Sequence, residues 1–140
     1  MSGVLIVKTM LGITPPFRTY PDDAGADLTV TRDVTLWPFV MTDLDTGWLI
    51  KIPNGYMGLI MPRSSTFKNM HISVHNGVID SNYTGKLCVM VRNLSLWPRK
   101  VKKGMRLAQL LIIPIERHHF REVTALPKTD RGPRGFGSTS

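Results

Sequence analysis

Small clusters of charged, hydroxyl and glycine residues recur along the sequence, and their chemistry suits a phosphorylated substrate. Arg63 is followed by Ser64 and Ser65 in a Pro-Arg-Ser-Ser segment. The guanidinium fork of an arginine and the free amides at the start of a helix both suit phosphate oxygens. The segment therefore indicates a phosphate cradle. Taken alone, it more commonly means a capped helix with an arginine at the surface.

A carboxylate and an aromatic ring lie close together in the segment 77–85. Asp80 follows the apolar pair Val78-Ile79 and precedes Tyr83. A carboxylate at such a strand end could activate a water molecule as a general base, and the tyrosine could offer a flat face to a sugar or a base. An Asx turn with a packed tyrosine is the alternative that these residues leave open.

The last part of the chain, residues 127–140, is rich in glycine and polar residues and includes Arg131 and Phe136. Such a composition cannot hold itself folded, so we expect a flexible C-terminal arm attached to a domain formed by residues 1–126. Glycine amides can approach phosphates closely, and the Phe136 ring could stack on a base. On its own, the segment also fits an ordinary disordered terminus.

The rest of the sequence predicts one compact all-β domain that positions these segments. Most apolar segments are short, rich in Val, Ile, Leu and Thr, and bounded by Gly, Pro, Asn or Asp, which is typical of a protein with many strands. A small closed barrel or a jelly roll would remove the exposed edges of so many strands. Asn54-Gly55 predicts a tight turn, and a short helix is expected only after Ser64. The expected strands are 3–8, 26–31, 33–41, 47–52, 56–62, 86–93, 99–102 and 106–116.

Composition narrows the class of protein further. The chain has 140 residues, is 42% hydrophobic and carries a net charge of +8, so it can bury a core and attracts polyanions. The lone Cys88 lies in an apolar run and is expected to be a small core residue. No apolar run is long enough to span a membrane as a helix. Because the N-terminal segment lacks a secretion signal, we expect an intracellular, soluble protein of the cytoplasm or nucleus.

Five segments, in this order and spacing, resemble the five motifs of the homotrimeric dUTPase family. The resemblance covers residues 24 to 139, and five motifs in register are far more specific than any one of them. It implies a β-barrel or jelly roll, assembled as a threefold trimer with shared active sites. It also implies magnesium-dependent hydrolysis of dUTP to dUMP and pyrophosphate. The five segments are 24–28, 62–65, 77–85, 104–110 and 131–139.

The resemblance also implies roles for individual residues. Asp80 would orient the water that attacks the α-phosphorus, and Tyr83 would pack against the sugar and exclude a ribose 2′-hydroxyl. The hairpin 75–80 would bind the uracil edge through its backbone and exclude the methyl group of thymine. The implied substrate-binding set is Arg63, Ser64, Ser65, His75, Asn76, Gly77, Val78, Ile79, Tyr83, Gly85, Arg131, Phe136 and Gly137.

The same resemblance assigns a Mg²⁺ cofactor to the site. Asp27 and Gln109 would contact the ion through its bound waters, while the substrate phosphates supply the direct ligands. Such an arrangement suits a hard ion that keeps several waters. Arg131 would bind the phosphates and Phe136 would cover the uracil, so that the arm closes the site of a neighbouring chain.

The sequence departs from the family pattern at three places. His75-Asn76 stands where small residues are usual, Asn82 where an acidic residue is common, and Pro133-Arg134 where a flexible pair is common. None of these changes removes a residue to which the resemblance assigns chemistry. We therefore expect activity.

Two other functions remain as alternatives. dCTP deaminases have a similar fold, but they place a catalytic glutamate where this sequence has Met90. A regulatory protein derived from a dUTPase, with an unknown protein partner, is the second alternative. The basic segment 99–103 could bind nucleic acid or steer dUTP, but a solvated turn is the expected interpretation, so nucleic acid is an unlikely partner on sequence grounds. Trp37, Trp48 and Trp97 are expected in the core or in trimer contacts.

Overall fold

The computed structural model describes residues 3–137, which form ten strands and one helix. The helix, α1, spans Ser64–Met70. The strands are β1 (Leu5–Lys8), β2 (Ala26–Thr29), β3 (Val34–Leu36), β4 (Met41–Lys51), β5 (Tyr56–Pro62), β6 (Ile72–Val74), β7 (Gly77–Ile79), β8 (Lys86–Asn93), β9 (Arg99–Val101) and β10 (Arg106–Pro114).

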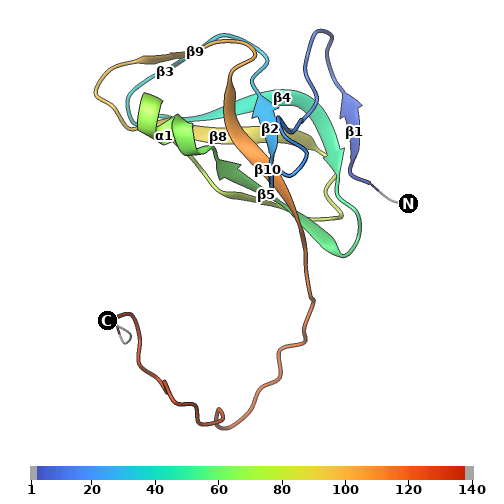
Figure 1. The fold of residues 1–140 in the computed structure, drawn as a ribbon, viewed down its shortest axis with the longest axis vertical. Helices are drawn as coiled ribbons and strands as arrows, with labels where there is room; N and C mark the ends of the chain where they lie inside the picture. The colour runs from blue at the N-terminus through green and yellow to red at the C-terminus, as the bar shows by residue number, and fades with distance from the viewer. Residues whose placement is uncertain (1–2, 138–140) are drawn as a thin grey trace.

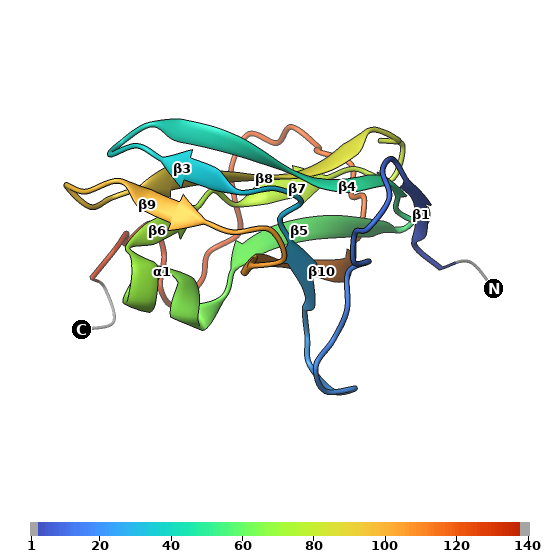
Figure 2. The same ribbon diagram turned by 90° about the horizontal axis from the view of Figure 1, so that it is seen from above.

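Two four-stranded sheets form the two layers of the fold. One has the strand order β1-β4-β8-β6, the other has the order β2-β10-β5-β7, and β3 and β9 form a separate two-stranded ribbon. Seen edge-on in Figure 2, the layer of β4 and β8 lies over the layer of β5 and β10. The expected jelly roll is confirmed. Within residues 3–137, however, the two sheets stay open at their edges and do not close into a barrel.

The core lies between the two sheets and follows the alternation of the strands. In β8, the side chains of Leu87, Val89 and Val91 are buried, while those of Lys86 and Met90 are exposed. Successive side chains of a strand point to opposite faces, so the apolar set of β8 packs inward and the other set faces outward. The outward residues of this core strand are therefore available to line a site.

Two expected strands, 33–41 and 47–52, have different boundaries in the structure. The first is interrupted between β3 and β4, where Pro38 and Phe39 end the extended backbone. Phe39 has a positive φ of 64°. The second begins earlier, since β4 runs from Met41 through Gly47 to Lys51. The pairing of β4 with β8 shifts register between Asp45 and Leu49. Gly47 has a φ of 83°, so a β-bulge lets the strand continue where the sequence suggested a break.

The expected hairpin 75–80 is wrong, because the chain crosses between sheets there. β6 pairs with β8 in one sheet, while β7 pairs with β5 in the other. The two short strands were not expected as strands, since each has only three residues. Residues 75–76 therefore connect the two layers and do not form a turn between paired strands.

The tight turn at Asn54-Gly55 and the helix after Ser64 are confirmed. Gly55 has a φ of 90°, and the Tyr56 amide donates to the Pro53 carbonyl at 3.2 Å. The buried Thr66 hydroxyl donates to the Leu107 carbonyl at 2.8 Å and fixes α1 against β10. The start of the helix is thereby held next to the residues of β10.

The chain leaves the two sheets after β10 and runs away from them as an extended segment (Figure 1). All residues from Glu116 to Gly137 are exposed. Ser138 and Thr139 of the last expected motif lie outside the described residues. Among residues 3–137, no helix has the length and hydropathy to cross a bilayer.

Candidate active site

A first cavity of about 310 Å³ lies where the chain crosses from one sheet to the other. β7 and Ile60 of β5 contribute one wall, and the outward residues of β8 contribute the other. Of the expected site residues, it brings together His75, the strand 77–79, Asp80 and Tyr83. The complete lining is Asp43, Ile60, His75, Gly77, Val78, Ile79, Asp80, Tyr83, Lys86, Cys88 and Met90.

The backbone of β7 is well placed to bind the edge of a heterocycle. β7 is the last strand of its sheet and pairs only with β5 in the strand order. An edge strand presents unpaired N–H and C=O groups along its free side. Because Gly77, Val78 and Ile79 line the cavity, a planar ligand there can be recognised through main-chain hydrogen bonds.

The turn after β7 presents the carboxylate of Asp80. The Tyr83 amide donates to the Asp80 carbonyl at 3.1 Å and closes the turn. Two cations hold the next residue, because Lys51 Nζ donates to the Ser81 carbonyl and the Arg117 guanidinium donates to the Ser81 hydroxyl at 3.2 Å. Within residues 3–137 the Asp80 carboxylate itself makes no hydrogen bond or ion pair. It is thus free to accept a proton from a water molecule.

Tyr83 has a fixed position at the rim of this cavity. Its hydroxyl donates to the Lys86 carbonyl at 2.7 Å. A Cβ atom on Gly85 would lie 2.6 Å from the ring carbon Cζ of Tyr83. Any residue larger than glycine at position 85 would therefore displace the ring, which gives this position of the third motif a structural role.

A second cavity of about 410 Å³ brings Arg63 and Ser64, two of the expected phosphate-binding residues, together with Asp27 and Gln109 of the expected metal site. Arg63 and Ser64 reach it from the start of α1, Asp27 from β2 and Gln109 from β10. β2 and β10 are paired, with Gln109 opposite Asp27. The lining comprises Thr19, Tyr20, Asp23, Ala24, Gly25, Asp27, Arg63, Ser64, Arg106 and Gln109.

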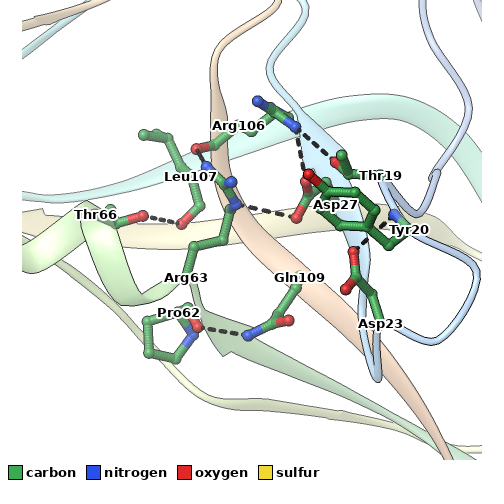
Figure 3. A network of polar contacts seen from close by, with 10 residues as sticks. All are labelled: Thr19, Tyr20, Asp23, Asp27, Pro62, Arg63, Thr66, Arg106, Leu107 and Gln109. Carbon is green, nitrogen blue, oxygen red and sulfur yellow. Dashed lines mark hydrogen bonds and ion pairs between the residues drawn. The ribbon is translucent and has the colours of Figure 1, made fainter.

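Two arginines surround Asp27 in this cavity. Arg63 Nε lies 3.0 Å from one carboxylate oxygen and Arg106 Nη1 lies 3.1 Å from the other (Figure 3). Arg63 also donates to the Arg106 carbonyl at 3.2 Å. One carboxylate thus orients two guanidinium groups, whose other N–H donors suit an anionic ligand. The lining also contains Asp23, so the formal charges of the two arginines and the two aspartates cancel.

Gln109 is held in the same wall. Its Nε2 donates to the Pro62 carbonyl at 3.0 Å. A Cβ atom on Gly25 would collide with the Gln109 side-chain oxygen, so glycine at position 25 makes room for this amide. The carbonyl oxygen of the same amide, Oε1, remains an acceptor.

The donor set of this cavity fits a metal ion only through water. Within residues 3–137, no three His, Cys, Asp or Glu side chains are grouped closely enough to hold a metal ion. Asp27 is already paired with two guanidinium groups. Asp27 and Gln109 can still accept hydrogen bonds from metal-bound water, which is how Mg²⁺ is commonly held beside a phosphorylated ligand.

The two cavities have no lining residue in common. One chain thus separates the residues that suit a base and a sugar from those that suit phosphates. Ser65 lies in the first turn of α1, and Asn76 lines a different surface hollow with Ser73 and Arg92. The arm residues Arg131, Phe136 and Gly137 are exposed and line neither cavity.

Several lining residues were not identified from the sequence. Arg106 lies in the fourth segment, but its ion pair with Asp27 depends on the register of β10 against β2. Asp43 reaches the first cavity only because β4 pairs with β8, which places Asp43 opposite Met90. No local pattern reveals such pairings, whereas the alternation in β8 already places Lys86 and Met90 on one outward face.

Cys88 also faces the first cavity and is half-buried. Burial, and then the nearby Asp43 and Asp45 carboxylates, raise the pKa of the Cys88 thiol to about 11. The thiol therefore stays protonated at neutral pH. It is a wall of the cavity and not a nucleophile.

Comparisons of the sequence and of the fold with known proteins all match dUTPases. The sequence profile of dUTPases matches residues 13–140. The deoxyuridine 5′-triphosphate nucleotidohydrolase of Cutibacterium acnes is 36% identical, in an alignment covering 99% of this chain and 93% of that protein. Its counterpart from fowlpox virus is 40% identical over 99% of this chain and 98% of that protein. The dUTPase of Staphylococcus bacteriophage 80alpha, solved with dUPNHPP, is 26% identical with a TM-score of 0.93, covering 100% and 99% of the two chains.

Proposed function

Because the chain belongs to the dUTPase family, we propose that its two cavities are the two halves of one active site, contributed by different chains. The protein is a dUTP diphosphatase, which hydrolyses dUTP to dUMP and pyrophosphate. The observation that supports a shared site is the separation of the two sets of residues within one chain. His75, residues 77–79 and Tyr83, which we propose for the base and the sugar, line one cavity, whereas Arg63 and Ser64, which we propose for the phosphates, line the other.

The first cavity would bind the deoxyuridine part of the substrate. The free edge of β7 would bind the uracil edge through main-chain groups, with His75 and Asn76 at the entrance. The ring of Tyr83 would lie against the deoxyribose and leave no space for a 2′-hydroxyl. Asp80 would then lie beside the α-phosphorus and take the proton of the attacking water.

The second cavity, from a neighbouring chain, would bind the triphosphate. Arg63 with Ser64 and Ser65 would donate hydrogen bonds to the phosphate oxygens, with Ser64 near the bridging oxygen that leaves. Magnesium bound with the triphosphate would neutralise phosphate charge, and Asp27 and Gln109 would hold its waters. The bond between the α-phosphorus and that bridging oxygen breaks as the water oxygen bonds, releasing dUMP and pyrophosphate.

The arm 127–140 would complete the site of a partner chain, beside the domain 1–126. Arg131 would bind the phosphates, and Phe136 with Gly137 would cover the uracil. The assembly is therefore proposed to be a homotrimer. Met90 lines the first cavity at the position where a deaminase would need a glutamate, and its thioether cannot transfer a proton.

Shared sites predict that two inactive variants restore each other. We expect Asp80→Asn and Arg63→Gln each to be inactive alone. After joint unfolding and refolding of an equal mixture, random trimers would have about a quarter of their sites built from intact halves. Activity near that fraction, measured as pyrophosphate release, is the expected result. The double variant Arg63→Gln/Asp80→Asn, unfolded and refolded in the same way, is the control, because none of its sites can combine two intact halves.

This complementation experiment also tests the assembly. Light scattering should give three chains for the wild-type protein and for each variant. A mixture without activity, or a monomer that hydrolyses dUTP at micromolar concentration, would contradict the shared site.

Tyr83 is expected to set the preference for deoxyribose. Removal of the ring in Tyr83→Ala should reduce the ratio of kcat/KM for dUTP to that for UTP by at least about tenfold, because steric exclusion of one hydroxyl is worth that much. Tyr83→Phe keeps the ring and loses only the hydrogen bond to Lys86, so it should keep the discrimination. Equal discrimination in Tyr83→Ala and the wild type would remove Tyr83 from this role.

A further inference from the structure

Two loops at the end of the β3–β9 ribbon expose a cluster of large apolar side chains. Loop 37–40 connects β3 to β4 and loop 94–98 connects β8 to β9. The exposed fraction is 59% for Trp37, 55% for Phe39, 76% for Leu96 and 72% for Trp97. The ribbon end that carries both loops lies opposite β1 (Figure 2). We call these four residues the aromatic platform.

A buried asparagine fixes the two loops to each other. Asn93 is fully buried, and its Nδ2 donates to the Leu36 carbonyl at 2.9 Å and to the Trp97 carbonyl at 2.7 Å. Its Oδ1 accepts from the Ser95 amide and the Ser95 hydroxyl. A fully satisfied buried amide makes a rigid connection. The platform is therefore preorganised and not a pair of loose loops.

Loop 37–40, which exposes the Phe39 ring, has a strained backbone. Phe39 has a φ of 64°, which a bulky non-glycine residue rarely adopts. The Phe39 amide donates to the Asn93 carbonyl at 2.7 Å and holds this conformation. Residues held in such rarely populated backbone conformations cluster at functional sites. Trp48 is buried in the core, whereas the exposed Trp37 and Trp97 are not core residues.

Cations continue from the platform along the outer face of the ribbon. β3 and β9 pair with Thr35 opposite Lys100 and Leu36 opposite Arg99. Leu36 is buried, so Thr35 and Lys100 face outward, as does Lys102 two residues further on. Within residues 3–137, none of the ion pairs involves Arg99, Lys100 or Lys102. The exposed side chains of the two loops are thus followed, along β9 and just beyond it, by two outward lysines, Lys100 and Lys102, that make no ion pair in the described part of the chain.

We propose that the aromatic platform, together with Lys100 and Lys102, is a binding surface for single-stranded nucleic acid. Aromatic side chains stack on unpaired bases, and cations beside them bind the phosphates of the same strand. The surface does not include residues of either cavity, so this binding is separate from hydrolysis.

Fluorescence anisotropy with a labelled thymidylate oligomer tests this surface in the full-length protein. Excess dUPNHPP keeps the active sites occupied, and thymine carries the methyl group that the uracil site is proposed to reject. A riboadenylate oligomer shows whether RNA binds as well, and duplex DNA tests the requirement for unpaired bases. Trp37→Ala/Trp97→Ala should weaken oligomer binding at least about tenfold, since stacking is lost.

Charge and stacking are tested by separate variants. Lys100→Glu/Lys102→Glu should also reduce the salt dependence of binding, by about 1.4 in the slope of log K against log salt concentration. Lys8→Glu/Arg121→Glu changes the net charge equally at two exposed positions outside the ribbon and its loops and is the matched control. All variants should remain trimeric and hydrolyse dUTP at the wild-type rate.

Three results would overturn the proposal. Binding of duplex DNA as tight as that of single strands would exclude stacking. An equal loss in the control variant would show attraction by net charge alone. Dissociation of the trimer in Trp37→Ala/Trp97→Ala would show that the platform is a contact between subunits.

Discussion

Replacement of Asp80 by asparagine is expected to lower kcat for dUTP hydrolysis by about 10²- to 10⁴-fold, the usual contribution of a general base. The Asp80 side chain lies at the rim of the first cavity, and within residues 3–137 its carboxylate is free of hydrogen bonds and ion pairs. An amide has the same shape but cannot take the proton of the attacking water. KM, dUPNHPP binding and the trimer should change little, because the turn is held through the Ser81 backbone and hydroxyl.

Asp43 is the matched control for this prediction. It is the other carboxylate that lines the same cavity, and we assign it no role in proton transfer. Single-turnover hydrolysis of dUTP by Asp43→Asn should be close to the wild-type rate. If Asp43→Asn loses turnover and Asp80→Asn keeps it, the general base is Asp43 and the assignment from the third motif is wrong.

The elements that local sequence determines were predictable. The alternation Leu87-Cys-Val-Met-Val gives β8 its buried and exposed faces. Asn54-Gly55 gives a turn because Gly55 adopts a positive φ. The helix after Ser64 follows from a short polar segment between apolar strands, and the structure gives it the bounds Ser64–Met70.

Features that depend on distant parts of the chain could not be predicted in this way. The strand β4 continues through Gly47 because β8 offers a partner on both sides of the bulge. The three-residue strands β6 and β7 exist only because β8 and β5 pair with them. Segment 75–80 therefore resembled a hairpin in sequence, although it crosses between two sheets.

The same distinction applies to the candidate site. Asp80, Tyr83, Arg63 and Gln109 belong to motifs, so the sequence identified them. The neighbours that orient them come from pairing and packing: Arg106 on Asp27, and Lys51 and Arg117 on Ser81. The division of the motifs between two cavities is likewise a property of the fold, since adjacent motifs give no indication of which chain completes a site.

Deletion of residues 130–140 is expected to reduce kcat/KM for dUTP by about 100-fold or more, the contribution of a lid that positions a substrate. Within residues 3–137, the hydrogen bonds of residues 129–135 all stay within the arm, as between Arg131 and the carbonyls of Arg134 and Gly135. Phe136 is fully exposed. The arm thus contributes no packing to the two sheets, and Tm of the deletion variant should equal that of the full chain.

The arm should become ordered when the nucleotide gives it partners. Arg131 and Phe136 are the groups that a triphosphate and a base would recruit, and Pro133 restricts the free segment, which lowers the entropic cost of ordering. Limited proteolysis of the full chain should cut within 127–137 in the free protein and be slowed by dUPNHPP with magnesium. Arg131→Ala should lose this protection, whereas Lys128→Ala, an exposed cation to which we assign no contact, should keep it. Hydrolysis by the deletion variant at the wild-type rate, or equal cutting with and without the nucleotide, would show that the arm is a passive terminus and that its match to the fifth motif has no role in catalysis.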